Sequence, residues 1–167
     1  HLELSLPSIW YEMQLVTPTS NVYGVSLPGS PFVIIGFNDS IAWGVTNSQR
    51  DVKDYYEIKF KDKSKKEYWF NGAWTNSTQR VEEIKVKGGK TVYDTVAYTV
   101  FGPVMYDENF QGAANEGKGR NLAVRWVGHD PSNEGYALYK LNRATNYDEY
   151  AEAIKGFECP GQNFIFA

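Results

Sequence analysis

Few residues in this chain could do chemistry, and none forms a self-evident catalytic set. The 167 residues include one cysteine, Cys159, and two histidines, His1 and His129. A lone cysteine cannot form an internal disulfide, and three such residues cannot complete a tetrahedral zinc site without carboxylates. The sequence holds no Gly-x-Ser-x-Gly elbow, no P-loop and no dinucleotide-binding glycine pattern. The residue types alone therefore assign no reaction.

One short acidic segment could bind a metal ion. Asp51 and Asp54 place two carboxylates and the carbonyls between them within four residues. Calcium prefers hard oxygen ligands of this kind. Two surface acids at the start of a strand would give the same pattern, so both interpretations stay open.

Composition excludes several classes of protein. The chain is 42% hydrophobic and 22% charged, which is typical of a globular domain. Its net charge of −3 provides no positive field for nucleic acid. No apolar stretch reaches the roughly 18 residues of a membrane span. We therefore expect neither a nucleic-acid partner nor a membrane partner.

The elements that must position any site are mostly strands. Short aromatic and β-branched runs, broken by Gly, Pro and Asn, are typical of strands. Asn71-Gly72 and Gly88-Gly89 carry hairpin-turn chemistry. The predicted strands are 21–27, 32–37, 41–46, 54–60, 67–70, 79–87, 91–101, 121–126 and 163–166.

Two helices are predicted after most of the strands. Asn146 can cap a helix together with Glu149, and a 3.6-residue apolar pattern follows it. Gly156 near its end would take positive φ. The second helix is expected over 133–143. This order of elements predicts an α+β fold, and 167 residues fit one domain.

The aromatic content leaves a non-enzymatic function open. Phe, Trp and Tyr make up 16% of the chain. Exposed rings could stack on sugars, which would make the chain a carbohydrate-binding β-module without chemistry of its own. Core packing would use the same residues.

Whole phrases of the sequence resemble the penicillin acylase (penicillin amidase) family of N-terminal-nucleophile hydrolases. They occur in family order along essentially the whole chain, so together they are more specific than any short motif. The phrases are 1–2, 6–12, 27–31, 36–38, 41–47, 102–104, 122–126, 141–144 and 160–164. The resemblance implies a strand-rich partial αββα sandwich.

The resemblance also implies an activity for a longer parent protein. Such enzymes are bacterial, periplasmic or secreted, and cut from a precursor into a small (alpha) and a large (beta) subunit. The large subunit begins with a serine whose own α-amino group acts as the base, and an acyl-enzyme forms during amide hydrolysis. The expected substrates are N-acylated small molecules of the β-lactam or acyl-homoserine lactone type. The serine precedes the segment that matches His1-Leu2, so we expect residues 1–167 to be an inactive, domain-sized excerpt that self-associates through exposed edges.

Three catalytic positions carry over from the family. His1 matches the residue beside the nucleophile; the alternative is that His1 is a tag remnant or part of a disordered terminus. The backbone N–H of Asn47 and the side-chain amide of Asn163 match the two donors of the oxyanion hole, which stabilise a tetrahedral intermediate. The alternative for Asn163 is an amide that ties a strand end to a loop. For Asn47 it is an ordinary strand end.

Two further groups of residues carry over. Leu2, Ile35 and Val45 match positions that line the acyl pocket of the family. Asp51, Asp54 and the carbonyl of Lys53 match its calcium site. Aliphatic residues suit an uncharged acyl group by burial alone, although core packing would use them equally well. The resemblance implies structural calcium and no organic cofactor.

Two positions depart from the family pattern. Phe37 and Phe101 stand where many members have histidine. Our hypothesis is that the two positions lie near one another and that an aromatic contact replaces a polar one.

Overall fold

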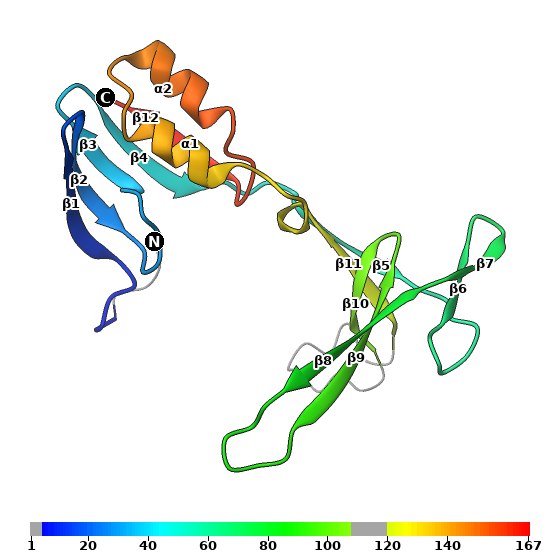
Figure 1. The fold of residues 1–167 in the computed structure, drawn as a ribbon. Helices are drawn as coiled ribbons and strands as arrows, with labels where there is room; N and C mark the ends of the chain where they lie inside the picture. Colours follow the sequence, from blue (N-terminus) through cyan, green and yellow to red (C-terminus); the bar gives the residue numbers. More distant parts are fainter. Residues whose placement is uncertain (1–4, 108–119) are drawn as a thin grey trace. The chain divides into compact units, whose positions relative to one another are not determined.

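A computed structural model gives the fold and describes residues 5–107 and 120–167 (Figure 1). The chain divides into two compact units, one of His1–Arg50 with Asp130–Ala167 and one of Asp51–His129. Each unit is described separately below. Within the described ranges, no helix has the length and apolar character needed to cross a membrane.

The first unit is an antiparallel sheet with two helices on one face (Figure 1). Its strand order is β1-β2-β3-β4-β12. The elements are β1 (Tyr11–Thr17), β2 (Ser20–Ser26), β3 (Ile35–Asn38), β4 (Ala42–Asn47), α1 (Glu134–Leu141), α2 (Tyr147–Ile154) and β12 (Gln162–Phe166). Val22, Ile41 and Trp43 of the sheet side are buried against Leu141 and Tyr150 of the helical side.

A buried amide joins the helical layer to the sheet. Asn142, at 2% exposure, follows α1. Its Oδ1 accepts from the backbone N–H of Val33 at 2.9 Å, and its Nδ2 donates to the Val33 carbonyl at 2.8 Å. Asn38 adds a bond from Nδ2 to the Ala144 carbonyl at 2.8 Å. The segment before β3 is thereby fixed to the end of α1.

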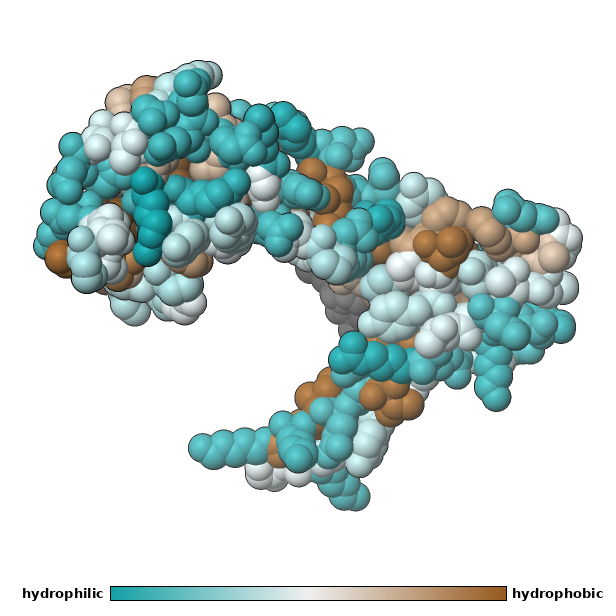
Figure 2. All heavy atoms as spheres, turned by 45° about the horizontal axis from the view of Figure 1, so that its top comes forward, coloured by the Kyte–Doolittle hydropathy of each residue, from teal (hydrophilic) through white to brown (hydrophobic). Residues whose placement is uncertain are grey.

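The second unit is a sheet of order β5-β11-β10-β9-β8 with a separate hairpin. Its strands are β5 (Lys53–Glu57), β6 (Glu67–Phe70), β7 (Ala73–Asn76), β8 (Thr78–Ile84), β9 (Val92–Thr99), β10 (Gly102–Tyr106) and β11 (Leu122–Trp126), followed by a short 3₁₀ helix, Val127–His129. Ile58, Tyr68, Ala97 and Ala123 are buried in its core. Figure 2 shows apolar side chains at the surface of the β8–β9 hairpin, where Val81 is 61% exposed.

The strand-rich α+β class is confirmed, and each predicted strand overlaps an observed one. Three strands were not predicted: β1, β7 and β10. The Asn71-Gly72 turn has positive φ at both residues, 48° and 82°. Both helices are confirmed, and Asn146 caps α2 by accepting from the Glu149 N–H at 3.0 Å. The expectation for Gly156 is wrong, because Gly156 is not among the residues with positive φ: α2 ends at Ile154, and the cap residue Lys155 is still right-handed. That 1–167 acts as one domain-sized excerpt stays a prediction.

Candidate active site

The two predicted oxyanion-hole residues lie on neighbouring strands. β12 pairs with β4 so that Asn163 is opposite Thr46 and Gln162 is opposite Asn47. The Asn163 Nδ2 donates to Thr46 Oγ1 at 3.1 Å and to the Asn47 carbonyl at 3.3 Å. The structure therefore brings Asn47 and Asn163 together, and the Asn163 amide joins two strands to each other, whereas its alternative interpretation had it tie a strand end to a loop.

The register of this pairing decides where the Asn47 N–H points. Ala42 and Ala167 exchange both of their backbone hydrogen bonds, at 2.8 and 3.0 Å. Hydrogen-bonded and non-hydrogen-bonded pairs alternate in an antiparallel ladder, so the Asn47–Gln162 pair, five residues further on, is a non-hydrogen-bonded one. In such a pair the N–H of Asn47 points away from β12.

The strand on the other side of β4 does not reach Asn47 either. Pairing between β3 and β4 consists of Phe37 with Ala42 and Gly36 with Trp43. Among the described strands, the Asn47 N–H therefore has no ladder partner. An unpaired backbone donor at the end of a rigid strand is what the predicted oxyanion role requires.

An apolar pocket of about 580 Å³ lies beside this strand end, entirely within the first unit. Ile35, Val45 and Asn47 line it, so three predicted positions share one pocket. The other lining residues are Trp10, Val25, Leu27, Ile34, Thr46, Leu138, Phe157, Pro160, Gln162 and Phe164. Such a wall can take an uncharged hydrocarbon or aromatic group, and its polar side-chain groups are those of Thr46, Asn47 and Gln162 and the indole N–H of Trp10.

Several residues of this site were not predicted. The Gln162 Nε2 donates to the Asn47 Oδ1 at 3.1 Å, which fixes the Asn47 side chain at the pocket wall. Trp10 and Gln162 lie in phrases that carry the family resemblance, but a phrase match gives no role to a residue. Phe157 follows α2, and in the sequence it continues the apolar pattern of that helix, so nothing marked it as a pocket residue.

The remaining predicted positions are the two N-terminal residues and the three residues of the predicted calcium site. His1 and Leu2 lie outside the described residues. Asp51, Lys53 and Asp54 belong to the second unit and are exposed. The part of the chain that the structure describes has no group of three or more His, Cys, Asp or Glu side chains that could hold a metal ion. A calcium ion at Asp51 and Asp54 would need further ligands, and calcium binding stays a prediction.

The two phenylalanines that replace family histidines have separate aromatic partners. The Phe37 ring lies 5.5 Å from the Tyr23 ring in the first unit. The Phe101 ring stacks on Tyr56 at 4.3 Å in the second unit. Each ring is thus held within its own unit, and the proximity of Phe37 to Phe101 stays a prediction.

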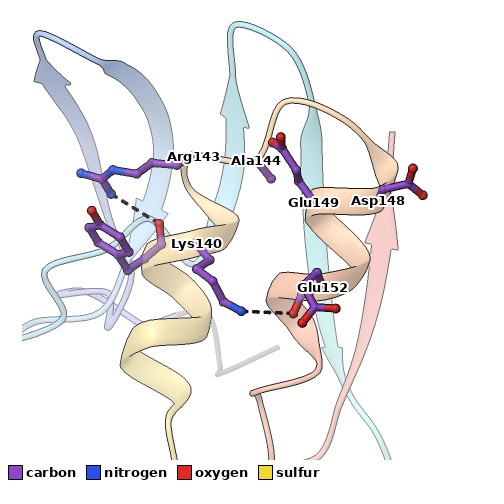
Figure 3. Close-up of a pocket in the computed structure, with 7 residues that line it drawn as sticks. Lys140, Arg143, Ala144, Asp148, Glu149 and Glu152 are labelled. Atoms are coloured by element: carbon purple, nitrogen blue, oxygen red, sulfur yellow. Dashed lines mark hydrogen bonds between the residues drawn. The ribbon is translucent and has the colours of Figure 1, made fainter.

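A second pocket, of about 460 Å³, lies between α1 and α2 (Figure 3). Lys140 points toward α2 and donates to the Glu152 carbonyl at 3.3 Å, whereas Arg143 points away and lies over the Tyr139 ring. The two cations do not converge, and acidic side chains of α2 lie opposite them. None of the predicted site residues lines this pocket, so we place the candidate site at the apolar one.

The fold matches part of a known acylase structure. The structure matches part of the thermostable penicillin G acylase from Alcaligenes faecalis with a TM-score of 0.79 and 29% identity, covering 97% of this chain and 28% of that chain. The strand-rich α+β fold is thus that of part of an acylase.

Sequence comparison identifies the family. The model of the penicillin amidase family matches residues 1–167. The chain belongs to the penicillin amidase family of N-terminal-nucleophile hydrolases, which confirms the resemblance.

Curated relatives include two acyl-homoserine lactone acylases named QuiP. The one from Pseudomonas aeruginosa is 27% identical over 173 residues, and the one from Pseudomonas fluorescens is 30% identical over 168 residues. Each match covers 100% of this chain and 20% of the relative. The chain therefore spans about a fifth of the length of these relatives.

Proposed function

We propose that the full-length parent protein hydrolyses the linear amide bond of N-acylated small molecules. The observation that carries this proposal is the Asn47 N–H, which has no ladder partner, at the edge of an apolar pocket, with the Asn163 amide bonded to the Asn47 carbonyl from the neighbouring strand. An acyl group in the pocket would place its carbonyl oxygen near the Asn47 N–H. The names of the relatives favour acyl-homoserine lactones and β-lactams with an acylated amine as the substrate classes.

The mechanism that fits this chain needs a nucleophile from elsewhere in the parent. We propose the serine at the start of the large subunit, with its own α-amino group as base and an acyl-enzyme as intermediate. The Asn47 N–H and one N–H of the Asn163 amide would stabilise the oxyanion. Because both Asn163 bonds are made within the described residues, the longer one, to the Asn47 carbonyl, would be exchanged for the oxyanion.

The wider context is proposed on the same basis. The first unit would supply one sheet and one helical layer of an αββα sandwich. The parent would be a periplasmic or secreted bacterial protein, cut from an inactive precursor into a small (alpha) and a large (beta) subunit. Structural calcium would bind at Asp51, Lys53 and Asp54, and His1 and Leu2 would lie beside the nucleophile.

The test is an assay on the complete gene product. Amine release from acyl-homoserine lactones and from penicillin G would be followed with a fluorogenic amine reagent, and residues 1–167 alone would serve as the preparation expected to be inactive. Release of amine by the parent and none by 1–167 is the expected result, whereas an inactive, correctly processed parent would refute the proposal. A sugar-array measurement on 1–167 tests the carbohydrate-binding alternative.

A further inference from the structure

We propose that Glu134 is a positioning residue that holds the turn 157–160 as one wall of the apolar pocket and thereby favours large acyl groups. This inference rests on the proposed amidase function. We call residues 157–160, which connect α2 to β12, the wall turn. The first evidence for this role of Glu134 is the three hydrogen bonds that its carboxylate accepts.

Glu134 is the first residue of α1 and is half-buried. Its Oε1 accepts from the backbone N–H of Cys159 at 2.9 Å and of Glu158 at 3.2 Å. Its Oε2 accepts from the Ser132 hydroxyl at 2.6 Å. Hydrogen bonds to a carboxylate are stronger than neutral ones, and a negative charge in the first turn also suits the helix dipole. The carboxylate is thus held in one orientation while it binds the wall turn.

Within the described residues, Glu134 alone accepts from the backbone N–H groups in the middle of the wall turn. The Phe157 N–H donates to the Ile154 carbonyl at 3.0 Å at one end, and the Gly161 carbonyl accepts from the Ser48 N–H at 3.1 Å beyond the other end. Pro160 has no N–H. Between these ends, the backbone N–H groups of Glu158 and Cys159 both donate to Glu134.

The wall turn contributes to the pocket directly. Phe157 and Pro160 line it, and the Phe157 ring packs edge-on against the Phe164 ring at 5.1 Å and 73°. Strand β12, by contrast, is held by five paired positions with β4. Loss of the Glu134 carboxylate should therefore loosen the pocket wall and leave Asn47 and Asn163 in register.

The electrostatics agree with this geometry. Burial acts to raise the pKa of Glu134, but the hydrogen bonds from Ser132, Cys159 and Glu158 outweigh it and hold the pKa below its usual value. The carboxylate is therefore the form that the wall turn selects at neutral pH.

The experiment compares two acyl lengths in the complete, processed protein, using decanoyl- and butanoyl-homoserine lactone. Glu134→Ala should raise KM for the decanoyl substrate about tenfold, the effect expected for losing charge-assisted hydrogen bonds. KM for the butanoyl substrate and both kcat values should stay within about twofold, because the short chain makes few contacts with the wall turn. Glu134→Gln keeps an oxygen acceptor for the turn and should largely restore the wild-type ratio.

Glu158→Ala is the matched control. It removes an exposed carboxylate from the wall turn itself but keeps the backbone N–H that donates to Glu134. The decanoyl-to-butanoyl ratio of KM should not change in this variant. The proposal would be overturned if Glu134→Ala raised KM equally for both substrates. It would also be overturned if Glu134→Gln raised KM for the decanoyl substrate as much as Glu134→Ala does.

A second measurement separates this inference from the proposed function. Hydrogen exchange at the amides of Glu158 and Cys159, read by mass spectrometry, should be slow in the wild type and in Glu134→Gln and much faster in Glu134→Ala. If Glu134→Ala does not fold, Glu134→Asp, which withdraws the carboxylate by one methylene, takes its place. An inactive wild type refutes the amidase, whereas unchanged amide exchange in a folded variant refutes the role of Glu134.

Discussion

Replacing Asn142 should separate the helical layer of the first unit from its sheet. Asn142→Ala removes both hydrogen bonds to Val33, whose backbone groups then lie unpaired at a residue with 0% exposure. Leaving a buried polar group unsatisfied costs about 1–3 kcal/mol. Two such groups, with some relief from water entering the space, give an expected loss of roughly 3 kcal/mol in the free energy of unfolding.

Asn142→Asp makes this prediction sharper because it changes one donor into an acceptor. One carboxylate oxygen can still accept from the Val33 N–H, but the other faces the Val33 carbonyl and is buried without a donor. At neutral pH, the Asn142→Asp substitution should therefore destabilise the fold at least as much as Asn142→Ala. Burial raises the pKa of such a carboxyl in the folded state, so the folded protein binds the proton more tightly and stability rises as pH falls.

The assay is urea unfolding of the complete protein and its variants between pH 7 and pH 5, with unchanged m-values as the condition for comparing stabilities. Asn76→Ala, at an exposed position of β7, is the control and should change stability by less than about 0.5 kcal/mol. A loss below about 1 kcal/mol in Asn142→Ala, or an aspartate variant whose stability does not rise on acidification, would refute the reasoning.

Three further predictions follow from contacts in the same unit. Asn163→Ala should lower kcat of the parent about 10²–10³-fold with little change in KM; steady-state kinetics check this, and a kcat within about tenfold of wild type would contradict the oxyanion role. Asn146→Ala removes the acceptor for the Glu149 N–H and should cost about 1 kcal/mol in urea unfolding, whereas Asn146→Ser should restore most of it. Because the pKa of Glu134 is lowered in the folded state, its contribution to stability is complete above the unfolded pKa and is lost as pH falls through the folded one. The protection of the Cys159 amide relative to its intrinsic exchange rate should therefore fall once the pH drops below the ordinary glutamate pKa of about 4.3 in the wild type but not in Glu134→Gln.

The sequence predicted the elements with strong local signals. The cap at Asn146 and the Asn71-Gly72 turn depend on contacts within a few residues, so their side chains specify the structure directly. β10 was missed because it begins with Gly102-Pro103, a pair that indicates a turn, although the backbone continues as a strand against β11. β7 follows directly from the predicted turn but has only four residues.

The candidate site was predictable only as far as the family resemblance named positions. Ile35, Val45 and Asn47 lie together at one pocket, but their side chains carry no local signal of a site. Asn142 bonds a residue 109 positions away, and no spacing rule reports a contact at that separation. In the sequence, Glu134 indicates only an acidic residue at the start of a helix. The structure confirms that position and adds the bonds to the wall turn.

The Asn47 N–H shows most clearly why the rest required coordinates. A backbone donor has no sequence signature, since every residue except proline carries one. Whether it is available depends on the parity of a ladder between strands more than a hundred residues apart and on where β3 stops. A shift of one residue in the β4–β12 register would pair the Asn47 N–H with β12 and turn the side chains of β12 to the opposite face. The chemistry that we propose for the parent thus depends on the same strand pairing that holds the first unit together.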